Sequence, residues 1–412
     1  MERLPGFRDF YPEPLPHQDV WSADARQYIF DQWRTIAKRY GFREYDGPPL
    51  EPLELFTTKS GEEIVGQLYN FTDKGERAVS LRPEMTPTLA RMVAAHERNY
   101  KKPIKWFAIP QLFRYERQQK GRLREHFQFN ADLIGETDPA ADAELIALLI
   151  DTLRAFGLTP ADFVIRLSSR NAWQDFFKHG GGDHAHEYEF FQIIDKLERS
   201  SPEESERKLV ALGFTLAGVK AFIESGRPTA ELQSILDNLG ARGLQDFVKI
   251  DYQVIRGLAY YTGVVFEAFD RKGEFRAIAG GGRYNNLVKL ISGGKVDLPA
   301  LGFGMGDVVL LELLKARGLL PKFDSHMDVF VLIEDEALRP ISLKLVHGLR
   351  AAGYAVEYPL TPAKPDKQFK RAQELKVAHT AKLENDDYVR IRNVRTRNEI
   401  VTGLAGAANH LG

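Results

Sequence analysis

Residues 256–267, with the sequence RGLAYYTGVVFE, place one arginine and two adjacent tyrosines directly before a β-branched and aromatic run. A run of that composition predicts a β-strand. The segment is therefore typical of a strand that carries a polar active-site cluster, here Arg256, Tyr260 and Tyr261. The simpler alternative is an edge strand whose arginine extends its charged end into solvent.

A second candidate, residues 113–136 (FRYERQQKGRLREHFQFNADLIGE), begins and ends like a strand. The connection between these ends carries Arg114, Arg117, Lys120, Arg122 and Arg124. Because one guanidinium group can hold two phosphoryl oxygens at once, this hairpin predicts a polyphosphate clamp. A solvated basic loop on an ordinary hairpin is the alternative.

Two further segments combine polar groups with special backbone residues. LRPEMTPTLARM at 81–92 places Glu84 and Thr86 near a predicted helix start, where Pro83 suits a first turn and a glutamate favours the positive end of the helix dipole. AIAGGGRYNNLV at 277–288 has three successive glycines, which allow the backbone to approach a ligand closely. A plain turn from a strand to a helix would explain the same glycines.

The composition limits the chemistry. With 56 basic and 57 acidic side chains the chain is nearly neutral, so any contact with nucleic acid must come from local patches. The absence of cysteine excludes disulfides, thiolate nucleophiles and cysteine-ligated zinc. No apolar run is long enough to span a bilayer, and we expect a soluble cytoplasmic protein with no membrane contact.

A length of 412 residues suits two or three domains. The order of the predicted elements indicates an α+β fold in three units. Residues 1–170 and 246–322 are expected to form one core with an antiparallel sheet flanked by helices. Its strands are predicted around 106–113, 127–134, 163–168, 248–269 and 274–280. Residues 171–245 are predicted to be a helical insertion, Pro321–Met327 a linker, and 327–412 an α/β domain with a largely parallel sheet.

Taken in order, these strings resemble those of the histidyl-tRNA synthetases, a class II aminoacyl-tRNA synthetase family. RGLAYYTG is similar to the histidine-specific signature, residues 113–136 to motif 2, and the strings at 81–92 and 277–288 to two more family segments. The resemblance runs from about Leu4 to Gly306. The final domain also resembles an anticodon-binding domain, where Lys364, Lys367, Lys370 and Arg371 lie at helical spacing and either face phosphate or form a solvated helix face.

The resemblance implies a ligase that activates histidine with ATP and Mg²⁺ and transfers it to tRNA(His), acting as a homodimer with Pro48 at the interface. A buried substrate ammonium needs acceptors, which the implied histidine site supplies. The implied catalytic residues are Arg114 and Arg256. The implied histidine-binding residues are Glu84, Thr86, Gln128, Asp132, Arg256, Tyr260, Tyr261 and Tyr284. The implied ATP-binding residues are Arg114, Glu116, Arg122, His126 and Phe127, and no residue is assigned to a protein metal site.

Two positions depart from the family pattern. Ala259 replaces a usual aspartate, and the arginine that ends motif 3 is absent, since Asp307, Val308 and Val309 stand there. We expect the helix that contains these three residues to pack into the core instead.

The rival hypothesis is the non-catalytic regulatory subunit of ATP phosphoribosyltransferase, which usually lacks a full anticodon-binding domain and erodes motif 2. This chain keeps both, which favours the ligase; a paralogue that keeps only the fold is the third option.

Overall fold

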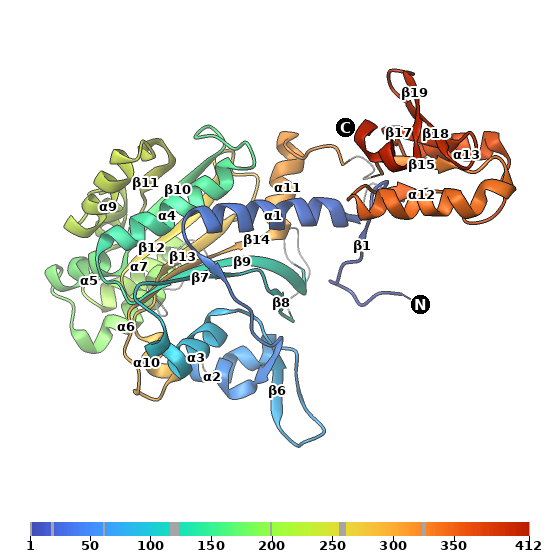
Figure 1. The fold of residues 1–412 in the computed structure, drawn as a ribbon. Coiled ribbons are helices and arrows are strands. Elements are labelled where there is room, and N and C mark those ends of the chain that lie inside the picture. Colours follow the sequence, from blue (N-terminus) through green and yellow to red (C-terminus); the bar gives the residue numbers. More distant parts are fainter. Residues whose placement is uncertain are drawn as a thin grey trace. The chain divides into compact units, whose positions relative to one another are not determined.

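The computed structural model describes residues 2–17, 20–60, 62–115, 123–197, 200–254, 261–323 and 327–411. Contacts within the chain divide it into two compact units (Figure 1). The first contains residues 1–11 and 17–320, and the second contains residues 321–412 together with 12–16.

A large sheet forms the centre of the first unit, and nine strands of the described residues belong to it. Its strands run in the order β11 (Val248–Ile250), β10 (Phe163–Ser169), β12 (Val264–Asp270), β13 (Ala279–Arg283), β14 (Ala300–Gly306), β9 (Glu125–Ile134), β7 (Ile104–Ala108) and β3 (Arg43–Glu44), with β8 (Gln111–Phe113) paired to β9. The pairings are antiparallel except those of β10 with β11 and of β3 with β7. The predicted α+β class with an antiparallel sheet is therefore confirmed.

Three helices cover one face of this sheet, and they are α1 (Ala23–Arg39), α4 (Pro139–Arg154) and α11 (Asp307–Arg317). Figure 1 shows α1 and α4 crossing the sheet. Their apolar side chains meet alternate residues of β9, because successive side chains on a strand point to opposite faces. Trp33 stacks on Phe129, with ring centroids 5.6 Å apart, and Phe30 lies 5.0 Å from Phe127. The other side chains of β9 are thereby left for the opposite face.

Smaller elements complete the first unit. The remaining strands are β1 (Phe10–Tyr11), β2 (Trp21–Ser22), β4 (Leu50–Pro52), β5 (Asn70–Thr72) and β6 (Ala78–Leu81). The remaining helices of the core are α2 (Leu53–Ser60), α3 (Thr86–His96) and α10 (Leu287–Ile291), with 3-10 turns at η1 (Glu62–Gln67), η2 (Glu97–Asn99) and η4 (Gln245–Phe247). Helices α3 and α10 pack together over the ends of β7, β9 and β14.

The predicted helical insertion consists of α5 (Arg170–His179), η3 (His184–His186), α6 (Glu187–Asp195), α7 (Pro202–Ala211), α8 (Leu216–Ser225) and α9 (Ala230–Ala241). An aromatic cluster holds it together. Trp173, Phe177 and Phe190 are fully or almost fully buried, and Phe177 stacks on Phe214 with centroids 5.2 Å apart. Aromatic side chains bury much apolar area for each residue, so a few of them stabilise a small helical region.

The second unit contains β15 (Val329–Leu332), η5 (Glu336–Leu338), α12 (Arg339–Ala351), β16 (Val356–Glu357), α13 (Pro365–Glu374), β17 (His379–Leu383), β18 (Tyr388–Asn393), β19 (Glu399–Gly403) and η6 (Leu404–His410). Its sheet has the order β16-β15-β17-β18-β19. The expectation of a largely parallel sheet is wrong, because β15 pairs in parallel with β16 and β17, whereas β18 pairs antiparallel with β17 and β19. Short turns join the last three strands, and a short turn permits only antiparallel pairing.

Three local predictions also need correction. Residues 261–263 precede the strand that begins at Val264, so the described part of the tyrosine segment is a loop. The glycines of 280–282 lie inside β13, so the alternative of a plain turn from a strand to a helix is wrong for them. The first turn of α3 contains Pro87, and Pro83 and Glu84 precede the helix.

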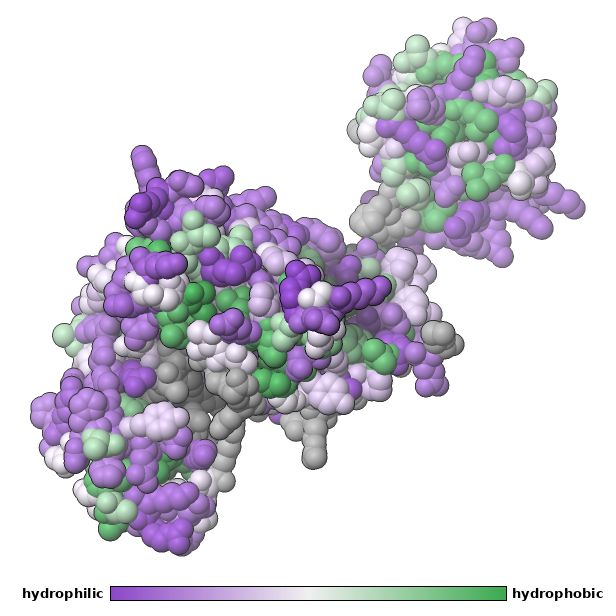
Figure 2. Space-filling view, turned by 90° about the horizontal axis from the view of Figure 1, so that it is seen from below, coloured by the Kyte–Doolittle hydropathy of each residue, from purple (hydrophilic) through white to green (hydrophobic). Residues whose placement is uncertain are grey.

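Polar residues dominate the surface that Figure 2 shows, and hydrophobic residues gather near the middle of the C-terminal unit there. Within the described ranges no single helix has the length and apolarity needed to cross a membrane, although a bent pair at 202–211 and 216–241 passes on length and composition alone.

Candidate functional site

A pocket of about 420 Å³ opens on the face of the sheet opposite α1. Strands β9, β12, β13 and β14 supply its floor, and the segment before α3 and the end of β8 supply one side. The lining residues are Glu84, Thr86, Arg114, Gln128, Asn130, Asp132, Val254, Tyr261, Val265, Phe266, Glu267, Gly280, Gly281, Tyr284, Gly302, Phe303 and Gly304. Segments far apart in the sequence therefore meet at one site.

Glycines keep the floor of the pocket open. In the strand register, Gly302 lies directly beside Asp132, and Gly304 lies beside Asn130 and Gly280. A Cβ atom added at Gly302 would overlap with the Asp132 carboxylate, and one at Gly304 would lie 2.7 Å from Gln128 Cδ. The missing side chains thus leave room for the polar groups of β9.

Carboxylates and tyrosine hydroxyls form the polar end of the pocket. The Tyr284 hydroxyl donates a hydrogen bond to Asp132 Oδ1. Burial raises the pKa of Asp132 to about 7 even though that hydrogen bond favours its ionised form. Burial also raises the pKa of Tyr261, with further contributions from the negative charges of Glu84, Glu267 and Asp132. Three acidic groups therefore lie around one tyrosine, an environment that favours a cationic ligand.

Asp132 is placed to bind a cation, but its ionisation should lower the stability of the free protein. Because its folded pKa of about 7 exceeds the ordinary 3.8, its contribution to stability is full below about pH 4 and declines as pH rises through 7. Asp132→Asn removes the ionisation, so the free variant should unfold at a higher temperature than the parent. That advantage should grow from pH 5 to 7 and level off above 8 in thermal scans. A variant that is less stable than the parent at every pH would contradict the assignment.

Positive charge lies at the other end of the site. Arg114 Nε donates to the carbonyl oxygen of Pro83 at 3.0 Å, which directs its side chain toward the segment that carries Glu84. His126 shares the pocket face of β9 with Gln128 by strand alternation. Burial, followed by the charges of Arg114 and Arg8, lowers the pKa of His126 to about 3. Its ring is therefore neutral at physiological pH.

A buried ion network supports this end of the sheet. Arg8 Nε lies 2.6 Å from Glu125 Oε1, and Arg8 Nη1 lies 2.8 Å from Asp307 Oδ2. Asp307 also accepts the Phe127 amide at 3.0 Å. The first residue of α11 is thus fixed to β9, and Val308 is buried as expected for a helix that packs into the core.

The structure brings seven of the predicted site residues to the pocket: Glu84, Thr86, Arg114, Gln128, Asp132, Tyr261 and Tyr284. His126 shares their face without lining the cavity, whereas Phe127 points to the other face and packs on Phe30. The prediction that Phe127 contacts ATP is therefore not supported, because neighbouring residues of a strand face opposite ways. Glu116, Arg122, Arg256 and Tyr260 lie outside the described residues.

Two polar lining residues were missing from the prediction, Asn130 and Glu267. The two-residue period of a strand could have found them, since Asn130 precedes Asp132 by two positions and Glu267 follows Val265 by two. The structural role of Arg8, which joins β9 and α11, was also missing from the prediction. Nothing in its local sequence indicates that it pairs with Glu125 and Asp307, which follow it by more than a hundred residues.

Comparison with known proteins gives a consistent result. A family model described as Histidyl-tRNA synthetase matches residues 16–307. A histidine–tRNA ligase of Opitutus terrae is 48% identical over 97% of this chain and 95% of its own length. One from Thermoplasma volcanium is 37% identical over 98% of this chain and 96% of its own. The crystal structure of histidyl-tRNA synthetase from Nostoc sp. PCC 7120 shares the fold, with a TM-score of 0.76 at 22% identity over 97% of both chains.

Proposed function

The chain belongs to the histidyl-tRNA synthetase family, and from this premise we propose that it is an ATP-dependent histidine–tRNA ligase whose active site is the pocket on β9 and β12–β14. It activates histidine as histidyl-adenylate and transfers the histidyl group to tRNA(His). The observation that carries the assignment of the site is the placement of Glu84, Asp132 and Arg114 around one cavity. An ammonium and a phosphate can therefore be held a short distance apart.

The amino-acid end of the pocket binds the ammonium and the imidazole of histidine. Glu84, Thr86 and Asp132 surround the ammonium, and Gln128 adds a neutral polar group beside them. A charge that leaves water needs such partners, because an unpaired buried ion is strongly destabilised. Tyr261 and Tyr284 enclose the imidazole. From the sequence, Arg256 and Tyr260 complete this site.

Activation requires no covalent enzyme intermediate. The histidine carboxylate oxygen forms a bond to the α-phosphorus of ATP, and the bond from that phosphorus to the bridging oxygen of pyrophosphate breaks. Arg114, with Arg256, neutralises charge on the reacting phosphate, so catalysis consists of positioning and electrostatic stabilisation. His126 presents a neutral, flat ring for adenine, and Glu116 and Arg122 are assigned to ATP from the sequence alone.

Magnesium is expected to bind together with the triphosphate of ATP. The described ranges hold no group of three or more His, Cys, Asp or Glu side chains suited to a metal ion. The resemblance implies an ion held chiefly by ATP oxygens, where it would offset phosphate charge.

The C-terminal unit is proposed to bind the anticodon region of tRNA. Lys364, Lys367, Lys370 and Arg371 are all exposed on or beside α13. A neighbouring groove of about 430 Å³ is lined by Phe369, Lys370 and Arg392, among others. Aromatic and cationic side chains together suit an unpaired base and its phosphate. A homodimer with Pro48 at its interface and a cytoplasmic location complete the proposal.

The regulatory-subunit hypothesis is not favoured, because the ligases of Opitutus terrae and Thermoplasma volcanium match almost the whole chain. A histidine-dependent pyrophosphate exchange assay, run with other amino acids in parallel, tests the choice. Exchange should occur with histidine and stay near background with the others. No exchange with any amino acid, together with stimulation of an added ATP phosphoribosyltransferase catalytic chain, would support the rival.

Removal of the second unit tests whether it serves tRNA binding alone. The buried clusters of the second unit consist only of residues from Met327 onward, so a chain that ends at Phe323 should fold with its own core. It should keep much of its histidine-dependent pyrophosphate exchange and lose most tRNA charging. Full charging by the truncated chain would remove the anticodon-binding assignment.

A further inference from the structure

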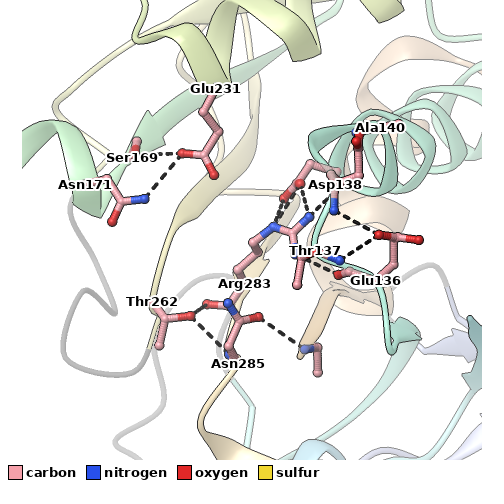
Figure 3. A network of polar contacts seen from close by, with 12 residues as sticks. Glu136, Thr137, Asp138, Ala140, Ser169, Asn171, Glu231, Thr262, Arg283 and Asn285 are labelled. Carbon is pink, nitrogen blue, oxygen red and sulfur yellow. Dashed lines mark hydrogen bonds and ion pairs between the residues drawn. The ribbon is translucent and has the colours of Figure 1, made fainter. Parts of the chain in front are cut away.

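Arg283 lies behind the pocket and does not line it, yet it is among the most extensively bonded side chains described (Figure 3). Its Nε lies 2.9 Å and 3.0 Å from the two Asp142 oxygens, and its Nη2 lies 2.5 Å from Asp142 Oδ2. Nη1 donates to the Glu136 carbonyl and Nη2 to the Asp138 carbonyl, each at 2.9 Å. The Asp142 side chain is 0% exposed and that of Arg283 is 4% exposed. This arginine therefore fixes the end of β13 to the start of α4.

The start of α4 is itself rigidly built. Asp138 is the N-cap of the helix, and its side chain accepts the Ala140 amide at 2.8 Å. Glu136 Oε1 accepts the amides of Thr137 and Asp138 at 2.8 Å and 3.0 Å. Capping of this kind fixes the backbone before a helix. The two carbonyls that receive Arg283 thus have defined positions.

The backbone around Arg283 connects to both tyrosines of the pocket. The Arg283 carbonyl accepts the Thr262 amide at 2.7 Å, and Thr262 directly follows Tyr261. The next residue, Tyr284, donates its hydroxyl to Asp132 and its amide to the Ala300 carbonyl. Asn285 donates its amide to Thr262 Oγ1 at 3.0 Å. Three successive residues therefore hold both aromatic walls of the cavity.

We propose that the Arg283–Asp142 pair positions Tyr261 and Tyr284, and thereby sets the affinity and selectivity of the amino-acid pocket. This inference rests on the proposed function, since it assigns those tyrosines to histidine. Neither Arg283 nor Asp142 touches the substrate. Their loss should loosen the walls of the histidine site and leave the Arg114 end unchanged, so the kinetic effect should be specific for one substrate.

The test compares two buried ion pairs of the same unit. Asp142→Asn alters the pair behind the pocket. Asp270→Asn alters the pair of Asp270 with Arg317, which has an N–O distance of 2.6 Å and an equally buried carboxylate at 0% exposure, and neither residue lines the pocket. Both variants should lose thermal stability. In pyrophosphate exchange, Asp142→Asn should raise the KM for histidine about tenfold or more, with the KM for ATP changed less than about threefold. Asp270→Asn should leave both KM values near those of the parent.

Thr262→Val supplies a milder variant that nearly keeps side-chain volume. It removes the hydroxyl that accepts the Asn285 amide and donates to the Arg283 carbonyl. It should raise the KM for histidine by about threefold to tenfold, with a smaller loss of melting temperature than Asp142→Asn. Equal changes of both KM values in Asp142→Asn, or a histidine KM in Thr262→Val equal to that of the parent, would overturn the inference. Activity of the parent with histidine is measured in the same plates, so failure of the proposed function is seen separately.

Discussion

Replacement of Asp132 or of Glu84 by alanine should each weaken histidine binding by a hundredfold or more while ATP binding changes little. Both side chains line the pocket, and Asp132 is buried at 4% exposure. Removal of one partner from a buried ion pair typically costs about 3 to 5 kcal/mol, which corresponds to a factor of a hundred to several thousand in affinity. Isothermal titration of each variant with histidine, and separately with an ATP analogue, measures the difference.

Asp270→Ala is the matched control for these titrations. It also removes a buried carboxylate of the first unit, but Asp270 bonds Arg317 and does not line the cavity. Histidine binding by this control should equal that of the parent at a temperature where it is folded. Normal histidine affinity in both Asp132→Ala and Glu84→Ala would mean that the amino-acid pocket is elsewhere.

Arg114→Ala should lower the rate of adenylate formation by roughly a hundredfold or more, by analogy with the loss of one oxyanion-stabilising donor. The arginine lines the same cavity as the carboxylates, so its charge can act on the phosphate next to the bound amino acid. Histidine affinity should change much less, because the side chain interacts with charge that develops as pyrophosphate leaves. Single-turnover measurement of adenylate formation separates the chemical step from binding.

Arg34→Ala provides the comparison for that experiment. It removes an arginine that pairs with Glu44 at 3.0 Å and lies outside the pocket lining. Its activation rate should equal that of the parent. An activation rate in Arg114→Ala within twofold of the parent would support the alternative hypothesis, in which the hairpin carries only a solvated basic loop. Arg256→Ala, placed from the sequence alone, should behave like Arg114→Ala.

Local patterns in the sequence predicted the parts of the site that lie within single strands or at their ends. Gln128 and Asp132 lie four positions apart in β9 and share a face for that reason. The glycines of 280–282 were recognised as a place of close backbone approach, although their location inside β13 was not. A glycine-rich strand next to charged neighbours has no distinct single-sequence signal, because glycine is more common in turns.

Features that depend on long-range pairing could not be predicted. Phe127 was assigned to ATP from the family resemblance, but the strand register turns it toward α1. Neither Arg8 nor Arg283 was assigned a role from the sequence, although Arg283 lies in the string at 277–288. Their roles arise only when folding places Glu125 and Asp142 beside them, at separations of 117 and 141 residues. The mixed sheet of the second unit likewise depends on how its last three strands are connected.

The motif 3 position bears on the activity of the whole enzyme. Asp307 occupies the start of α11, where it pairs with Arg8, and no arginine follows it directly. Arg8 is buried and also pairs with Glu125, so this network offers no free positive charge to a phosphate. Arg114 is the described arginine that lines the pocket. Loss of one arginine from an ATP site is therefore compatible with activity, since several groups share the neutralisation of phosphate charge.

Aminoacylation of tRNA tests the central claim most directly. The purified full-length chain, incubated with labelled histidine, ATP and magnesium, should charge a tRNA that bears a histidine anticodon, and it should not charge that tRNA with other amino acids. Formation of histidyl-tRNA should disappear when ATP is omitted. A chain that is folded by thermal scan and binds histidine, yet forms no histidyl-tRNA under these conditions, would contradict the account.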